Sequence, residues 1–160
     1  MKLKLMVVLL FADLFSIPCA AQVLIKDSLN YIQSPKISAN PSALNFIAMG
    51  DWGRNGADHQ LQVAKQMGIT ANEIGSQFTI ATGDNFYPSG VISEWDPLWK
   101  YSFEDIYTDF RLQWDWYPVL GNHDYKSNPD AQIKYSSISR RWKMPARYYS
   151  KIISINGDTT

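Results

Sequence analysis

The sequence predicts an α/β domain with a largely parallel sheet, and three observations support this prediction. Short apolar runs alternate with stretches whose apolar residues recur every three or four positions, in the order strand, helix, strand, helix, strand, helix. Each apolar run is nearly continuous, which is typical of parallel strands buried on both faces. Each run also ends at a glycine that is followed at once by polar residues.

The composition fits a folded domain and excludes several classes of protein. With 46% hydrophobic and 14% aromatic residues, the chain of 160 residues is too apolar for a disordered protein. Its 15 Lys and Arg residues balance 15 Asp and Glu residues, so we expect no nucleic-acid partner. The single cysteine excludes an intramolecular disulfide framework and a zinc site built from thiolates.

The first 21 residues are predicted to be a secretory signal peptide. Lys2 and Lys4 precede an apolar run, and small residues after that run suit cleavage after Ala21. The run is shorter than the roughly 20 apolar residues that span a bilayer. Asp13 interrupts it, and a buried N-terminal helix is the alternative interpretation. We therefore expect a secreted or periplasmic protein with no stable membrane anchor after cleavage.

Residues 22–42 mix Ser, Asn and Pro and predict a leader segment before a domain at residues 43–160. The apolar run 44–49 predicts the first strand, which ends at Gly50. A helix is predicted next, because one apolar face repeats at helical spacing before Gly75. The members of this face are Leu61, Ala64, Met67, Ala71 and Ile74.

A second strand is predicted at residues 78–82, ending at Gly83. A second helical face follows it, with Ser93 as the N-cap and Pro97 in the first turn. The members of this face are Trp95, Trp99, Ser102, Phe103, Ile106 and Phe110. We interpret the concentration of aromatic residues between 86 and 117 as packing on the sheet rather than as a surface for sugar or base stacking.

The third strand is predicted at residues 116–120, ending at Gly121, and a third helix at residues 132–142. The segment 148–155 predicts a further strand that leads into a hairpin turn at Asn156-Gly157. The basic pair at the end of the third helix, Arg140-Arg141, has two interpretations. It either lies on a solvated helix face, as is usual, or attracts a substrate phosphate.

Three polar clusters follow the three predicted strands. Carboxyl ends of parallel strands meet at one edge of a sheet, where α/β proteins bind ligands, so we expect the clusters to converge. Together they supply two carboxylates, a phenol, an amide oxygen and an imidazole, which are mostly hard ligands for metal ions. The clusters read Gly50-Asp51-Trp52-Gly53, Gly83-Asp84-Asn85-Phe86-Tyr87 and Gly121-Asn122-His123-Asp124.

The patterns D-x-G, G-D-x-x-Y and G-N-H-D resemble the first three metal-binding blocks of the calcineurin-like metallophosphoesterases. More narrowly, the chain resembles purple acid phosphatases of the small tartrate-resistant type over about residues 44–155. Tyr87 carries this narrower resemblance, because most members of the superfamily instead have a histidine where this sequence has Gly53. The resemblance implies the N-terminal half of a four-layer α/β/β/α sandwich.

The resemblance also implies a role for each polar residue. Asp51 would bind the first metal ion, Asp84 would bridge both ions, and Tyr87 would bind the first ion as a phenolate. Asn122 would bind the second ion through its amide oxygen and contact the substrate. His123 would be the catalytic residue that faces the substrate phosphate and the leaving group. Asp124 is expected to orient a neighbouring group by hydrogen bonding.

The implied cofactor is a dinuclear centre of Fe(III) and a divalent Fe, Zn or Mn ion. Asp51, Asp84 and Tyr87 are three anionic donors, which favour a small, highly charged ion, whereas the neutral Asn122 suits a divalent one. The implied reaction is acid phosphatase hydrolysis of phosphate monoesters by a hydroxide that the two metal ions activate. The implied substrate is a small phosphate monoester or a phosphorylated protein.

The sequence departs from the family pattern in two ways. The family supplies three further histidine ligands, whereas this chain has only His59 and His123. We therefore expect an N-terminal fragment that is inactive alone, the alternative being a degenerate, metal-free relative. Arg54 stands where the family commonly has a small residue.

Two other functions remain as alternatives. One is a phosphodiesterase or nucleotidase of the same superfamily. The other is a nucleotide-binding α/β module without catalysis, which the glycine spacing after the first strand makes conceivable. These glycines are Gly50, Gly53 and Gly56.

Overall fold

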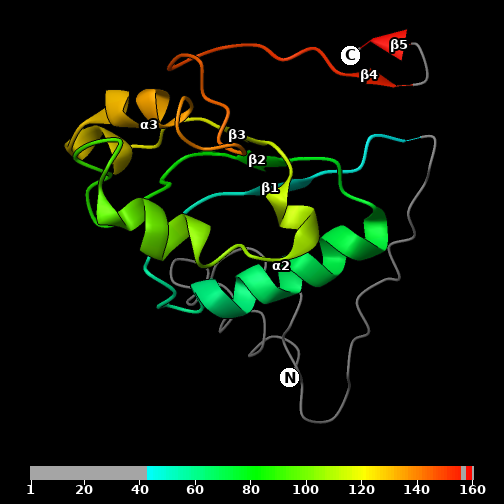
Figure 1. Cartoon of the computed structure of the whole chain (residues 1–160), viewed down its shortest axis with the longest axis horizontal. Helices are drawn as coiled ribbons and strands as arrows, with labels where there is room; N and C mark the ends of the chain where they lie inside the picture. Colours follow the sequence, from blue (N-terminus) through cyan, green and yellow to red (C-terminus); the bar gives the residue numbers. More distant parts are fainter. Residues whose placement is uncertain (1–42, 156–157, 160) are drawn as a thin grey trace, which may run out of the picture. The chain divides into compact units, whose positions relative to one another are not determined.

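The computed structural model describes residues 43–155 and 158–159, and its main element is a three-stranded parallel sheet in the order β1-β2-β3 (Figure 1). Its strands are β1 (Ile47–Met49), β2 (Thr79–Ala81) and β3 (Trp116–Pro118). The predicted α/β class with a parallel sheet is confirmed. The predicted signal peptide at residues 1–21 and leader at 22–42 lie outside the described residues.

The two faces of the sheet differ in burial. On one face the register aligns Thr79 with Trp116, and both are buried against the aromatic core. On the other face Ala48, Ile80 and Tyr117 stand side by side, and Ala48 is exposed. The prediction that strand 44–49 is buried on both faces is therefore wrong for the described part of the chain, because the aromatic core covers one face only.

Helix α2 (Gln60–Ile74) matches the first predicted helix, and it packs below the sheet in Figure 1. It ends at Gly75, whose φ of 66° lies in the left-handed region and whose amide donates to carbonyl oxygens of the last turn. Leu61 is exposed instead of buried, because the buried face runs through Gln60, Val63 and Ala64. Among the described residues, no helix is long and apolar enough to span a bilayer.

The second predicted helix is wrong as one continuous element. The chain instead forms a short π-helix, η2 (Trp99–Glu104), and a separate 3₁₀ turn, η3 (Phe110–Gln113). Ser93 accepts a hydrogen bond from the Trp95 amide but caps only a short turn, and Trp95 is 74% exposed. The carboxylate of Asp96 holds that turn by accepting from the amides of Ile92 and Leu98.

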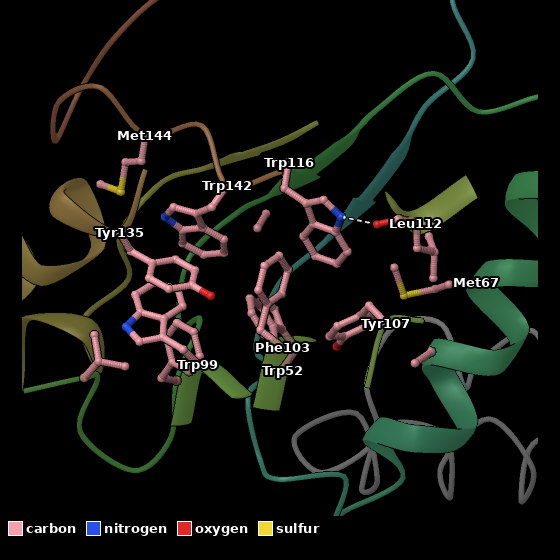
Figure 2. Close-up of a cluster of buried hydrophobic side chains, with 14 of the residues drawn as sticks. Trp52, Met67, Trp99, Phe103, Tyr107, Leu112, Trp116, Tyr135, Trp142 and Met144 are labelled. Atoms are coloured by element: carbon pink, nitrogen blue, oxygen red, sulfur yellow. Dashed lines mark hydrogen bonds between the residues drawn. The ribbon is translucent and has the colours of Figure 1, made fainter. Parts of the chain in front are cut away.

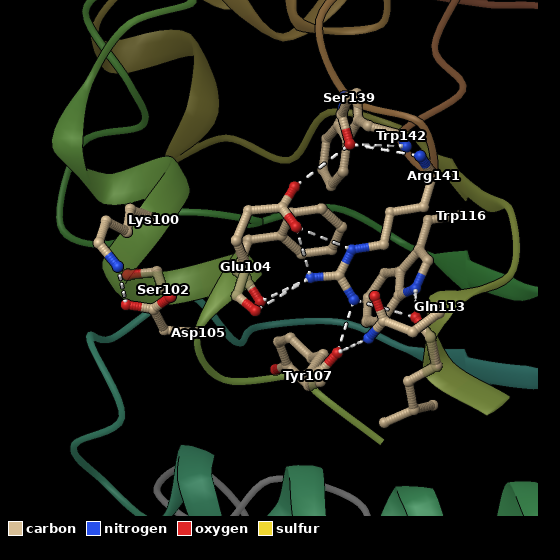
Figure 3. A network of polar contacts seen from close by, with 12 residues as sticks. Lys100, Ser102, Glu104, Asp105, Tyr107, Gln113, Trp116, Ser139, Arg141 and Trp142 are labelled. Atoms are coloured by element: carbon tan, nitrogen blue, oxygen red, sulfur yellow. Dashed lines mark hydrogen bonds and ion pairs between the residues drawn. The ribbon is translucent and has the colours of Figure 1, made fainter. Parts of the chain in front are cut away.

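Arg141 binds the chain between η2 and η3, where the predicted helix is interrupted (Figure 3). Its side chain is 2% exposed and pairs with Glu104, whose Oε2 lies 3.0 Å from Nη2. The guanidinium also donates to the carbonyl oxygens of Phe103, Tyr107 and Leu112, at 3.0, 2.6 and 3.0 Å. Burial lowers the pKa of Arg141, and Glu104 opposes that shift. For Arg141, the solvated-face interpretation and the phosphate interpretation are therefore both wrong, because its guanidinium is buried and bonded to backbone carbonyl groups. Arg140 is exposed, as the solvated-face interpretation expects.

The third predicted helix is shorter than the sequence indicates. Helix α3 (Pro129–Tyr135) begins at a proline, as helices often do, and ends before Ser136. Beyond it the chain turns back and runs beside β3, where the Trp116 amide donates to the Arg141 carbonyl and Trp116 pairs with Trp142. This pairing with β3 is what removes residues up to 142 from the helix.

The last elements form the predicted hairpin. Strand β4 (Ser154–Ile155) pairs antiparallel with β5 (Asp158–Thr159), which confirms the hairpin although the strand is shorter than the predicted segment 148–155. The turn residues Asn156 and Gly157 lie outside the described residues. Earlier in the chain, a 3₁₀ turn, η4 (Asp124–Lys126), lies between β3 and α3.

The core beneath the sheet is largely aromatic (Figure 2). The predicted packing role is confirmed for five of the aromatic residues between 86 and 117, whereas four others are exposed. The five buried residues are Phe86, Trp99, Phe103, Tyr107 and Trp116, and the four exposed ones are Trp95, Tyr101, Phe110 and Trp114.

Trp52 lies at the centre of this core, and its indole contacts five aromatic rings from other segments. These are the rings of Phe86, Phe103, Tyr107, Trp116 and Trp142. Because Trp52 directly follows Asp51, the core anchors the chain where the first polar cluster begins.

Candidate metal centre

Three loops leave the carboxyl ends of the strands: the first loop (residues 50–54), the second loop (83–87) and the third loop (121–124). The first two continue the parallel pairing of their strands. The Gly53 amide donates to the Asn85 carbonyl at 3.0 Å, and the Tyr87 amide donates to the Gly53 carbonyl at 2.8 Å. This pairing sets the first and second polar clusters side by side.

The paired loops bring Asp51, Asp84 and Tyr87 together. The Tyr87 hydroxyl donates to Oδ1 of Asp51 at 2.7 Å and to Oδ2 of Asp84 at 3.0 Å. Both aspartates have left-handed backbones, with φ of 58° and 49°, a conformation found often at functional sites. Burial and both carboxylates raise the pKa of Tyr87, so without a cation the phenol stays protonated. A bound metal ion would reverse this effect.

The third loop adds His123 to the same group. Its backbone amide donates to Oδ1 of Asp84 at 2.8 Å, and its ring centroid lies 4.5 Å from that of Tyr87. Nδ1 of His123 lies 2.6 Å from the Pro88 carbonyl oxygen, which can only accept, and this contact favours a proton on Nδ1. The ammonium group of Lys126, 3.0 Å from the same nitrogen, opposes that preference because it can only donate. Asn122 is exposed on this loop, and its side chain has no hydrogen bond to a described residue.

Asp124 holds the third loop against the second. Its carboxylate is fully buried and accepts hydrogen bonds from the backbone amides of Gly121, Asn85 and Phe86, at 2.9 to 3.2 Å. The side-chain amide of Gln132 donates to it at 2.8 Å. Burial raises the pKa of Asp124, and these four donors oppose the shift. The carboxylate therefore fixes the backbone of both loops rather than pointing into the site.

Glycines allow the loops to approach this closely. A Cβ on Gly53 would overlap the Asn85 carbonyl, and a Cβ on Gly121 would overlap Asp84. A Cβ on Gly50 would crowd the Thr82 hydroxyl. Gly56 has a φ of 80°, and a Cβ there would lie 3.1 Å from Cδ1 of Ile106. The spacing of Gly50, Gly53 and Gly56, which suggested a nucleotide-binding loop, is thus explained by packing and backbone conformation.

The donors that converge fit part of the coordination shell of a hard cation. They are two carboxylates and one phenol, all oxygen ligands, and each carboxylate lies within hydrogen-bond distance of the phenol. Within residues 43–155 and 158–159, no group of three or more His, Cys, Asp or Glu side chains could hold a metal ion. His59 lies apart from this group, exposed at the start of α2.

Two cationic residues border the group, and the sequence did not assign a role to either. The Cζ atom of Arg54 lies 3.7 Å from the Tyr87 ring centroid. Nζ of Lys126 lies 3.0 Å from Nδ1 and 3.2 Å from Nε2 of His123. The contact of Lys126 with His123 could have been predicted from their spacing of three residues, because residues three apart lie on one side of a 3₁₀ turn.

Comparisons with known proteins give one family and several relatives. The sequence model of the calcineurin-like phosphoesterase family matches residues 44–158. Purple acid phosphatase 17 of Arabidopsis thaliana is 47% identical over 102 residues, which are 62% of this chain and 30% of that protein. Tartrate-resistant acid phosphatase type 5 of Homo sapiens is 41% identical over 113 residues, 67% of this chain and 35% of that protein.

A third relative and one solved structure also match only part of their own length to this chain. Purple acid phosphatase 7 of Arabidopsis thaliana is 38% identical over 137 residues, 86% of this chain and 40% of that protein. The structure of GAP50, the anchor in the inner membrane complex of Plasmodium, superposes with a TM-score of 0.62 and 27% identity. That match covers 72% of this chain and 39% of the Plasmodium chain. The chain thus spans less than half the length of these relatives.

Proposed function

This chain belongs to the calcineurin-like phosphoesterase family, and we propose that it forms the metal-binding part of a purple acid phosphatase that hydrolyses phosphate monoesters. Its purple and tartrate-resistant acid phosphatase relatives support the hydrolase class. The observation that carries the narrower proposal is the contact of the Tyr87 hydroxyl with both Asp51 and Asp84. A phenol between two carboxylates is the donor set that suits trivalent iron.

The residues of the three loops divide into two proposed metal sites. Asp51, Asp84 and Tyr87 would hold Fe(III), and Asp84 with Asn122 would contribute to a site for divalent Fe, Zn or Mn. When bound, such a pair of ions would polarise the phosphoryl oxygens and lower the pKa of bound water. The described donors fill only part of such a centre, so we propose that residues 1–160 alone are inactive.

His123 is the proposed proton donor to the leaving group. The contact of Nδ1 with the Pro88 carbonyl supports a proton on Nδ1, which would leave Nε2 as the nitrogen that exchanges a proton with the departing alcohol. The backbone amide of the same residue holds Asp84, which couples the position of the imidazole to the proposed metal ligands. Asn122, beside it on the exposed rim, would contact the substrate phosphate.

Substrate, partner and location follow from the same proposal. The substrate would be a small phosphate monoester or a phosphorylated protein, as the resemblance to purple acid phosphatases implies. Export by the proposed signal peptide would place the enzyme outside the cell or in the periplasm, with no stable membrane anchor and no nucleic-acid partner.

Replacing Tyr87 by phenylalanine tests the purple assignment. In the complete gene product loaded with iron, we expect a visible absorption band from charge transfer between tyrosinate and Fe(III), and Tyr87→Phe should abolish it. The exposed Tyr101 supplies the matched control, since Tyr101→Phe should leave the band unchanged. A colourless, active, zinc-only enzyme would contradict the purple assignment and leave the family assignment intact.

A further inference from the structure

Arg54 places a positive charge directly beside the candidate metal centre. Its guanidinium lies over the ring of Tyr87, whose hydroxyl contacts the carboxylates of Asp51 and Asp84. Within the described residues, the guanidinium pairs with neither of these carboxylates, and its ion pair is with Asp58. A phosphate group bound next to Tyr87 would therefore lie within reach of the guanidinium.

The backbone that carries Arg54 is held on both sides. Its own amide and that of Gly56 donate to Oε1 of Gln60, at 2.9 and 2.8 Å. The Gln60 side chain is buried and donates in turn to the Ser102 carbonyl at 2.7 Å. On the other side, Gly53 pairs with the second loop. Because the backbone is fixed before any ligand arrives, only the Arg54 side chain has to be ordered when a ligand binds.

The existing partner of Arg54 is easily exchanged for a ligand. Nη1 lies 3.5 Å from Oδ2 of Asp58, whose side chain is 71% exposed, and ion pairs this exposed contribute little to stability. A phosphate group, in contrast, can accept two parallel hydrogen bonds from one guanidinium. The contacts also continue from Tyr87 through His123 to Lys126, so a second cation lies beyond the imidazole.

We propose that Arg54 is a substrate-binding residue whose guanidinium contacts the non-bridging oxygens of the phosphate group. The inference rests on the proposed phosphatase function and adds a residue to its site. The ligand class is a phosphate monoester before the reaction and inorganic phosphate after it. Arg54 thus supplies positive charge to the substrate phosphate. Of the three proposed ligands of the first metal ion, it contacts only Tyr87, over the face of the ring, and pairs with neither Asp51 nor Asp84.

The test compares Arg54→Ala, Arg54→Lys and the control Arg140→Ala in the complete, metal-loaded gene product. Arg140 is exposed on the turn after α3. For Arg54→Ala we expect the KM for 4-nitrophenyl phosphate and the inhibition constant of inorganic phosphate to rise about tenfold or more. We expect kcat to change less than about threefold and the metal content to stay the same. Arg54→Lys should recover only part of the affinity, and Arg140→Ala should behave as wild type.

An unchanged KM and an unchanged phosphate inhibition constant in Arg54→Ala would overturn the proposal. So would a loss of metal or of folding stability with normal phosphate affinity, since that result would show a structural role. If the wild-type protein has no phosphatase activity, the proposed function fails, and calorimetric titration with inorganic phosphate decides the role of Arg54 separately. Weaker phosphate binding by Arg54→Ala would then support the proposal, and equal or absent binding by both proteins would overturn it.

Discussion

Replacing Asp124 by alanine is expected to lower the free energy of unfolding by at least about 3 kcal/mol. The change removes the buried carboxylate that accepts from the backbone amides of Gly121, Asn85 and Phe86. Each amide would be left without a partner inside the protein, at a cost of about 1–3 kcal/mol per group. Urea unfolding of the chain measures this loss as a lower midpoint.

Two further variants make the Asp124 prediction specific. Asp124→Asn keeps the shape of the side chain but replaces one accepting oxygen by an amide group that faces backbone donors, so a large loss remains. Asp130→Ala is the control, because Asp130 is exposed and pairs with Arg147 on the surface, and we expect a change below about 1 kcal/mol. If Asp124→Asn unfolds at the same urea concentration as wild type, the carboxylate does not hold the two loops.

Replacing Asp84 by alanine in the complete gene product is expected to remove both metal ions and to lower kcat/KM by roughly a thousandfold or more, which corresponds to several kcal/mol of lost metal assistance. The reason is the central position of this carboxylate. One oxygen accepts from Tyr87 and the other from the His123 amide, so it faces both proposed metal sites. Elemental analysis of the purified protein measures the ions, and a standard phosphatase assay measures the rate.

Folding and bridging effects of this change can be separated. Asp84→Asn keeps an oxygen that can accept from the His123 amide but removes the negative charge, so it should fold normally and still lose metal. Asp105→Asn is the control, because Asp105 pairs with Lys100 on the exposed side of η2 and should leave activity and metal content unchanged. Retention of two ions per chain in Asp84→Ala would refute the bridging role.

Local sequence signals predicted the sheet and the meeting of the loops. The apolar runs predicted the positions of β1, β2 and β3. Gly75 predicted the end of α2, because glycine adopts the left-handed backbone conformation that ends a helix. Parallel strands share one carboxyl edge, so Asp51, Asp84 and His123 could be expected to meet there. Tyr87 joins them because the first two loops continue the strand pairing.

The features that sequence reasoning missed depend on contacts between distant residues. The apolar spacing from Trp95 to Phe110 favours one helix. The structure interrupts it between η2 and η3, around Tyr107, whose carbonyl accepts from the guanidinium of Arg141, a residue far away in the sequence. The second missed feature is the pairing of Trp142 with Trp116 of β3. Because this pairing draws the chain to the sheet, α3 ends earlier than its sequence predicts. The basic character of Arg141 pointed to solvent, whereas its pairing with Glu104 and five-donor geometry allow it to be buried.

The central claim is that the three loops gather oxygen donors into one metal-binding pocket, and anomalous X-ray diffraction from crystals of the iron- and zinc-loaded gene product tests it most directly. We predict two anomalous peaks roughly 3.5–4 Å apart. One peak should lie about 2 Å from carboxylate oxygens of Asp51 and Asp84 and from the phenol oxygen of Tyr87. Peaks located elsewhere, with the Tyr87 hydroxyl still donating to both carboxylates, would contradict the claim.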